Sequence, residues 1–175
     1  MKDDGTAKQG TILLVDDEDN VLRALERSLH RAGDYAILKC SGAREALTLL
    51  KTERVDVVIS DHLMPEMKGM DFLVEVRKRH PDVIRILLTG HADVEVAIAG
   101  INSGKLFRFL QKPWDDDELR RIVAKALEVS KLQHGSRAFV EDVKNQEEYK
   151  SRLESKYPGI SKVKRDKDGT IIIDE

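Results

Sequence analysis

Short apolar runs recur along the first two thirds of the chain, and each is bounded by polar residues. The runs are rich in Val, Ile and Leu and hold few charged residues. Such runs are typical of strands in a parallel sheet covered on both faces, because both sides of each strand are then buried. The pattern predicts five strands, at residues 11–15, 35–40, 55–60, 83–88 and 105–110.

The segments between these runs carry apolar residues at helical spacing. In the fourth such segment, Val94, Ala97, Ile98 and Ile101 fall at positions i, i+3, i+4 and i+7, so they are predicted to form the buried stripe of a helix. A fifth helix is predicted to begin near Asp115, because the acidic residues that follow favour the first turn of a helix. The other predicted helices occupy residues 20–32, 42–53 and 67–80, and the fourth occupies 92–103.

Strands that alternate with helices predict an α/β fold with a doubly wound parallel sheet and right-handed crossovers. We expect a flavodoxin-like (βα)5 arrangement with the strand order 2-1-3-4-5. In such sheets, ligands bind at the carboxyl ends of the strands, near the point where the strand order reverses. The chemistry is therefore expected at that edge of the sheet.

Reactive side chains follow four of the predicted strands at the point where each strand ends. Asp16 and Asp17 come after the first strand, and Asp61 comes after the third. Thr89 follows the fourth strand and Lys112 follows the fifth. In the expected strand order, all five side chains converge on one edge of the sheet.

These residue types together suit phosphoryl transfer. Carboxylates crowded into one pocket repel each other, and a bound hard cation relieves that repulsion. Mg²⁺, or alternatively Mn²⁺, takes oxygen ligands of this kind. Asp61 can act as a nucleophile, since carboxylates form aspartyl phosphates. Lys112 supplies a positive charge, and the Thr89 hydroxyl can donate to a phosphoryl oxygen.

Four segments carry a resemblance to a known family. The chain from residue 11 to residue 131 resembles the receiver domain of bacterial response regulators, which act in two-component signal transduction. The matching segments are VDDE (15–18), SDHLMPEMKGMD (60–71), LLTGHAD (87–93) and FRFLQKPWDDDEL (107–119).

The resemblance implies a role for each residue at the strand ends. Asp61 is the phosphoacceptor, and its phosphodonor is a histidine kinase, a phosphotransfer protein or a small phosphodonor. Asp16, Asp17 and Asp61 hold Mg²⁺, with Asp17 the more direct ligand of the pair, and the backbone carbonyl of Leu63 completes the metal shell.

The resemblance also implies how the phosphoryl signal is read. Thr89 moves toward the phosphoryl group, Phe109 turns inward behind it, and the Lys112–Pro113 peptide bond is cis. The protein then acts as a phosphorylation-controlled switch. It is a phosphoacceptor with slow self-dephosphorylation and has no turnover of a substrate.

The face formed by the fourth helix, the fifth strand and the fifth helix is the predicted partner surface. Val96, Ala99 and Gly100 lie off the apolar stripe of the fourth helix. Small apolar residues of this kind cost little free energy to bury against a partner. We expect homodimer formation on phosphorylation. The alternative is that scattered exposed apolar residues have no special role.

The remaining segments have weaker patterns. Residues 1–10 are predicted to be a disordered leader, and residues 132–156 a helical extension that His134–Gly135–Ser136 interrupts. Residues 157–175 are predicted to form a small β-hairpin, with Asp168–Gly169 at its turn.

Composition bounds the classes of function. The formal net charge is -2, which gives no overall attraction to nucleic acid, so we do not expect a nucleic-acid partner. Cys40 is the single cysteine and excludes an internal disulfide, as suits the cytoplasm, and no apolar run is long enough to cross a membrane.

Two alternatives stay open at this stage. One is a DNA-binding transcriptional regulator that uses the basic C-terminal tail, where Lys162, Lys164, Arg165 and Lys167 gather. The other is a phosphatase or phosphotransferase with an aspartyl nucleophile. That enzyme would need a general acid and a substrate pocket, and the sequence indicates neither.

Overall fold

The computed structural model describes residues 8–156, with the side chains of residues 8–136. Its strands are β1 (Thr11–Val15), β2 (Ala36–Cys40), β3 (Val57–Asp61), β4 (Ile84–Thr89) and β5 (Arg108–Gln111). Its helices are α1 (Asp19–His30), α2 (Ala43–Leu49), α3 (Gly69–Arg79), the 3₁₀ turn η1 (His91–Asp93), α4 (Val94–Asn102) and α5 (Asp116–Lys156).

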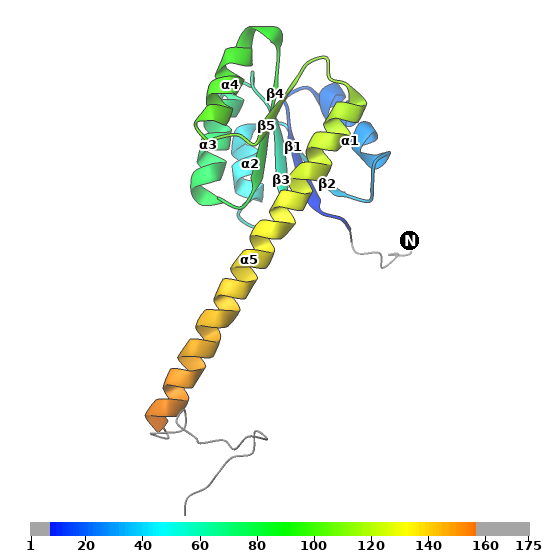
Figure 1. Ribbon diagram of the computed structural model, residues 1–175. Coiled ribbons are helices and arrows are strands. Elements are labelled where there is room, and N and C mark those ends of the chain that lie inside the picture. Colours follow the sequence, from blue (N-terminus) through cyan, green and yellow to red (C-terminus); the bar gives the residue numbers. More distant parts are fainter. Residues whose placement is uncertain (1–7, 157–175) are drawn as a thin grey trace, which may run out of the picture. The chain divides into compact units, whose positions relative to one another are not determined.

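The five strands form one parallel sheet in the order β2-β1-β3-β4-β5 (Figure 1). This order confirms the predicted flavodoxin-like topology. The strand order reverses beside β1, because the chain passes from β1 to β2 on one side and then to β3 on the other. The carboxyl ends of β1 and β3 therefore lie next to each other.

Helices cover both faces of the sheet, as Figure 1 shows. Ile12 and Leu14 of β1 point into an apolar core that α1 and the first turns of α5 close. Leu13 and Val15 point the other way, into a second core that α2, α3 and α4 close. Burial on both sides explains why the strands read as nearly continuous apolar runs, since each buried Leu or Ile contributes about 1.5–3 kcal/mol.

The buried face of α4 differs from the prediction. Ile98 is 46% exposed, whereas Gly100 is buried. A Cβ atom on residue 100 would lie 2.4 Å from Cε of Met70 and 2.8 Å from Cδ1 of Leu106. The helix therefore packs closely on its neighbours through Gly100, and this close approach turns Ile98 outward. Gly100 is thus removed from the predicted partner surface.

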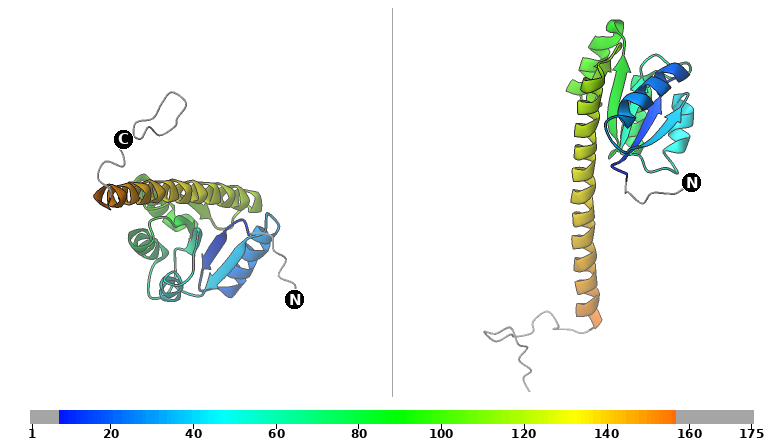
Figure 2. Two further views of the ribbon diagram at one scale, coloured as in Figure 1. Left: turned by 90° about the horizontal axis from the view of Figure 1, so that it is seen from below. Right: turned by 90° about the vertical axis from the view of Figure 1, so that its right-hand side faces the viewer.

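The two ends of the described chain agree with the prediction in part, since residues 132–156 are helical as predicted. Ordered pairing begins two residues early, because Gln9 donates to the Asp34 carbonyl and Gly10 accepts from Ala36, each at 2.9 Å. Helix α5 continues without a break through His134–Gly135–Ser136 (Figure 2). The predicted hairpin at 157–175 lies outside the described residues.

The chain forms two compact units that divide between Gln133 and His134.

None of the helices within residues 8–156 has the length and apolar character needed to cross a membrane.

The start of α5 is held by side chains on both sides of the loop that precedes it. Asp115 caps the helix, because its Oδ1 accepts the backbone N–H of Glu118 at 2.8 Å. Asp116 accepts hydrogen bonds from the Ser28 hydroxyl of α1 at 2.6 Å and from the Trp114 indole at 3.2 Å. These contacts fix the loop that carries Lys112 against α1.

Candidate functional site

Three carboxylates meet at the carboxyl edge of the sheet. Asp16 and Asp17 follow β1, and Asp61 ends β3, which lies beside β1. Their side chains offer oxygens that lie within 4.8 Å of one another. Asp16 and Asp61 are buried and Asp17 is exposed, so the cluster opens to solvent on one side. Such a set of carboxylate oxygens fits the ligand preference of Mg²⁺.

Lys112 closes the cluster from the end of β5. Its Nζ lies 2.7 Å from Oδ1 of Asp61 and 3.3 Å from Oδ2 of Asp16. Burial alone would lower the pKa of Lys112, but the hydrogen bond to Asp61 and the charges of both carboxylates outweigh it, and the pKa is raised. Lys112 is therefore a permanent positive charge facing the carboxylates.

The backbone around Lys112 is fixed as well. Its N–H donates to the carbonyl of Thr89 at 2.8 Å. The Lys112–Pro113 peptide bond is cis, as the family resemblance implies. The ammonium group is thus directed at the carboxylates from a backbone held by its neighbour strand.

Asp16 is the most deeply placed of the three acids. Its Oδ1 accepts the backbone N–H of Glu18 at 2.8 Å, which orients the carboxylate. Burial raises the pKa of Asp16, and the charge of Asp61 adds to this, although the Glu18 hydrogen bond and Lys112 oppose it. A nearby cation would therefore stabilise the ionised form of Asp16.

Asp61 is held by the close approach of α3. The carbonyl of His62 accepts the N–H of Gly69 at 2.8 Å. A Cβ atom on residue 69 would lie 1.8 Å from the carbonyl oxygen of Asp61, a separation that no folded chain tolerates. Only glycine permits α3 to begin directly against the strand that carries Asp61.

The other predicted site residues lie around this edge. Thr89 ends β4, is fully buried and lies next to β3. Leu63 follows Asp61 by two residues and is 61% exposed. Phe109 is partly buried against the core under α4. It also lines a hollow of about 580 Å³ between α4, β5 and α5.

A family model for the response regulator receiver domain matches residues 12–124. The chain belongs to this family.

Related proteins support the same assignment for the receiver domain. It is 40% identical over 126 residues to the hydrogenase transcriptional regulatory protein HoxA of Cupriavidus necator, covering 72% of this chain and 26% of that relative. It is 35% identical over 120 residues to the DNA-binding transcriptional regulator NtrC of Escherichia coli K12, covering 69% of this chain and 25% of that relative. The chain thus spans about a quarter of the length of these curated relatives.

A solved structure gives the same result. The signal receiver domain of an HD domain-containing protein from Pseudomonas fluorescens Pf-5 is 38% identical, with a TM-score of 0.64. The similarity covers 69% of this chain and 96% of that one. The part of the chain that contains the acidic cluster therefore has the receiver fold.

The loop after Asp61 contains an unusual turn in this receiver domain. Met67 donates its N–H to the Pro65 carbonyl at 2.8 Å, and Glu66 between them has a φ of 69°. This is a tight γ-turn, a conformation that non-glycine residues rarely adopt. The turn reverses the chain between Asp61 and α3.

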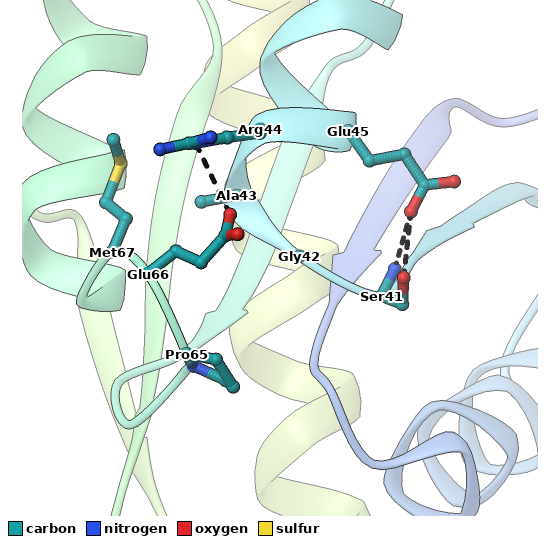
Figure 3. A pocket seen from close by; sticks show the side chains of 8 residues that line it. All are labelled: Ser41, Gly42, Ala43, Arg44, Glu45, Pro65, Glu66 and Met67. Atoms are coloured by element: carbon teal, nitrogen blue, oxygen red, sulfur yellow. Dashed lines mark hydrogen bonds and ion pairs between the residues drawn. The ribbon is translucent and has the colours of Figure 1, made fainter.

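Glu66 and Arg44 of α2 both line a hollow of about 310 Å³. Figure 3 shows the Glu66 side chain directed toward Arg44. Its carboxylate lies 3.3 Å from the Arg44 Nε. Both side chains are well exposed, so this ion pair contributes at most about 1 kcal/mol. The turn is therefore held mainly by its own backbone hydrogen bond and by Gly69.

Replacing Asp16 by Asn is expected to raise the free energy of unfolding of the receiver domain in metal-free buffer at pH 7. Since folding raises the pKa of Asp16, the ionised carboxylate destabilises the folded state at neutral pH. That penalty is relieved as the pH falls through the folded-state pKa. The amide keeps an oxygen for the Glu18 hydrogen bond, and urea unfolding measures the change.

Mg²⁺ should reverse this order of stabilities. At a free Mg²⁺ concentration of 100 times the dissociation constant, binding would stabilise the wild type by about 2.7 kcal/mol. The Asn variant should gain less stability, because it has one carboxylate fewer to bind the ion. A lower stability of the variant in metal-free buffer would contradict the expectation.

Gly69 and Glu66 shape the site, and neither role was predicted from the sequence. For Gly69 a signal was present, since a glycine at the first position of a helix is unusual unless backbone packs against it. For Glu66 the residue type carries no such signal, because its φ follows from the tight loop around it.

Proposed function

We propose that this receiver domain accepts a phosphoryl group on Asp61 and thereby switches conformation, as a phosphorylation-activated response regulator. One observation carries the proposal. The Asp61 carboxylate, 2.7 Å from the Lys112 ammonium, shares a pocket with the two acids that follow β1. Asp16, Asp17 and Asp61, with the backbone carbonyl of Leu63, would hold Mg²⁺.

Asp61 supplies the nucleophile for the transfer. One of its oxygens attacks the phosphorus of a phosphohistidine on a partner kinase or phosphotransfer protein. An O–P bond forms, the P–N bond breaks, and the imidazole takes up a proton as it leaves. A bound Mg²⁺ would offset the negative charge of the carboxylate and of the incoming group.

Two residues of this chain can bind the product. Lys112 can pair with a phosphoryl oxygen once Asp61 has become the neutral carbonyl side of an acyl phosphate. The Thr89 hydroxyl, at the end of the neighbouring strand, can donate to another phosphoryl oxygen. Because these bonds exist only after transfer, they shift the population toward a conformation that favours them.

The transfer is tested with acetyl phosphate and Mg²⁺. The intact protein should gain the mass of one phosphoryl group, and the added group should be labile to hydroxylamine, as acyl phosphates are. Chelation of the metal with EDTA should prevent the gain. Absence of any added mass with Mg²⁺ present would overturn the proposal.

The output surface is part of the proposal. Val96 on α4 is 40% exposed and Ala99 is exposed beside it, and Ile98 joins them at 46%. With Gly100 excluded, these three exposed apolar side chains of α4 are the candidates for the partner surface. A surface of this kind can be covered by a second copy of the domain.

Homodimer formation on activation is therefore an expected result. Sedimentation velocity should show one species near the monomer mass in the free protein. Beryllofluoride with Mg²⁺ should add a species of twice that mass, and Ile98→Asp should remove it without preventing phosphorylation. A monomer under both conditions would contradict dimerisation but leave phosphoryl transfer standing.

A nucleic-acid partner is the second candidate function. The relatives HoxA and NtrC bear the names of transcriptional regulators, and that of NtrC includes DNA binding. These names do not support our expectation from charge that nucleic acid is not a partner. Binding to duplex DNA that weakens steeply with added salt would favour this function. A histidine kinase as phosphodonor and a cytoplasmic location belong to the main proposal.

A further inference from the structure

His62 is a buried histidine directly beside the proposed phosphoacceptor. It is 3% exposed, and its backbone N–H donates to the Leu88 carbonyl at 2.9 Å. The register of β3 and β4 sets Asp61 opposite Leu88, so the next residue of each strand, His62 and Thr89, lie side by side. Since side chains alternate along a strand, the His62 side chain points away from that of Asp61.

The imidazole of His62 has one nitrogen without a hydrogen-bond partner and a second nitrogen close to a carboxylate. Within residues 8–136, its Nδ1 is the one buried side-chain nitrogen or oxygen with no hydrogen-bond partner. Its Nε2 lies 3.9 Å from Oδ1 of Asp93, about 1 Å beyond hydrogen-bond length. The unpaired Nδ1 lowers stability wherever Asp93 lies, whereas a hydrogen bond to Nε2 would be gained only if Asp93 came closer.

Asp93 occupies a position from which movement can be transmitted. It is the last residue of η1 and directly precedes α4. At the other end of η1, His91 forms a hydrogen bond with Gln111 of β5, which lies opposite Thr89 in the sheet. The segment between β4 and α4 therefore approaches His62, the residue after β3, through Asp93, and it is bonded to β5 through His91.

We propose that His62 is a positioning residue that couples the phosphoacceptor strand to the start of α4 through Asp93. The proposal rests on the proposed function for its trigger. When Thr89 moves toward a phosphoryl group on Asp61, η1 moves toward β3. A shift of about 1 Å brings Asp93 into hydrogen-bond range of the His62 Nε2–H.

The neutral imidazole suffices for this role. The tautomer with its proton on Nε2 presents the donor to Asp93 and leaves only a lone pair on Nδ1. The hydrogen bond gained in the shifted conformation replaces a contact that is incomplete in the present one. His62 therefore favours the conformation in which α4 begins closer to β3.

The test compares the full chain carrying His62→Leu, His62→Gln or Asp93→Ala with wild type. Hydrogen exchange of residues 94–102 is measured in the free protein and with beryllofluoride and Mg²⁺. The ratio of the two exchange rates reports the response of α4. His62→Leu and Asp93→Ala should each reduce this ratio about fivefold, the low end of couplings between sites. His62→Gln, which keeps a donor near the Nε2 position, should restore most of it.

Two further measurements separate this role from others. Acetyl phosphate labelling of Asp61 should stay within about twofold of wild type in every variant, since none of them removes a proposed phosphoryl or metal ligand. His62→Leu should also raise Tm, because it removes an unpaired buried nitrogen, whereas a residue needed only for packing would lower it. Failure of wild type to label would contradict the proposed function instead. A labelled His62→Leu protein with the wild-type exchange ratio would overturn the coupling role.

Discussion

Replacing Asp61 by Asn should abolish formation of an acyl phosphate on this protein. The amide keeps the shape of the side chain but has no anionic oxygen to attack phosphorus. It also removes the charge that Lys112 pairs with at 2.7 Å, so Lys112 retains only its contact with Asp16 at 3.3 Å. Intact-mass spectrometry after incubation with acetyl phosphate and Mg²⁺ should show no phosphorylated species.

Asp71→Asn is the matched control for this loss. Asp71 is exposed in the first turn of α3 and lies outside the acidic cluster. The substitution is the same exchange of an aspartate for an asparagine. It should be phosphorylated at the wild-type rate. Undiminished label on the Asp61→Asn protein would place the phosphoryl group elsewhere and remove the basis of the proposed function.

Replacing Gly69 by Ala should destabilise the fold more than any surface substitution. The new methyl group would lie 1.8 Å from the Asp61 carbonyl oxygen. Neither atom can rotate away, because the oxygen is backbone and the Cβ is fixed directly to the helix backbone. The start of α3 must therefore move from β3. We expect a loss of about 3 kcal/mol, at the upper end of overpacking effects. For a domain of this size, Tm should fall by roughly 10 °C.

Gly90→Ala provides the comparison. Gly90 lies next to Thr89, has an ordinary φ of -82°, and would place its Cβ in open space. Its Tm should stay within about 3 °C of wild type, because the alanine restricts the unfolded chain without a clash. Equal stability of the two variants would contradict the close approach of α3 to β3. Any Gly69→Ala protein that remains folded should also label more slowly, since Asp61 must shift with its backbone.

The acidic cluster shows why part of a functional site can be predicted from sequence. The carboxyl ends of parallel strands meet at one edge, so residues that end strands are brought together by topology alone. Asp16, Asp61 and Lys112 follow buried strands at their ends, and the alternation of strand and helix predicts a parallel sheet. Their meeting therefore needed no knowledge of side-chain packing.

The faces of helices are less securely predicted. Periodicity placed Ile98 in the core and Gly100 on the surface, and the structure reverses both. Hydrophobicity scales rank residues by their free energy of transfer from water, and on that ranking isoleucine is expected to be buried. At the contact with Met70 and Leu106, however, the space between elements admits only a residue without a side chain.

The sequence by itself determined the number and order of the elements, the parallel sheet and the identity of the residues at its reactive edge. These follow from local periodicity and from chain connectivity, which are properties of neighbouring residues. Only the tertiary structure decided that Asp16 is buried while Asp17 is exposed, that Gly69 touches Asp61, and that His62 lies just out of range of Asp93. Each of these depends on distances between elements, and those distances are set by how all the side chains of the core fit together.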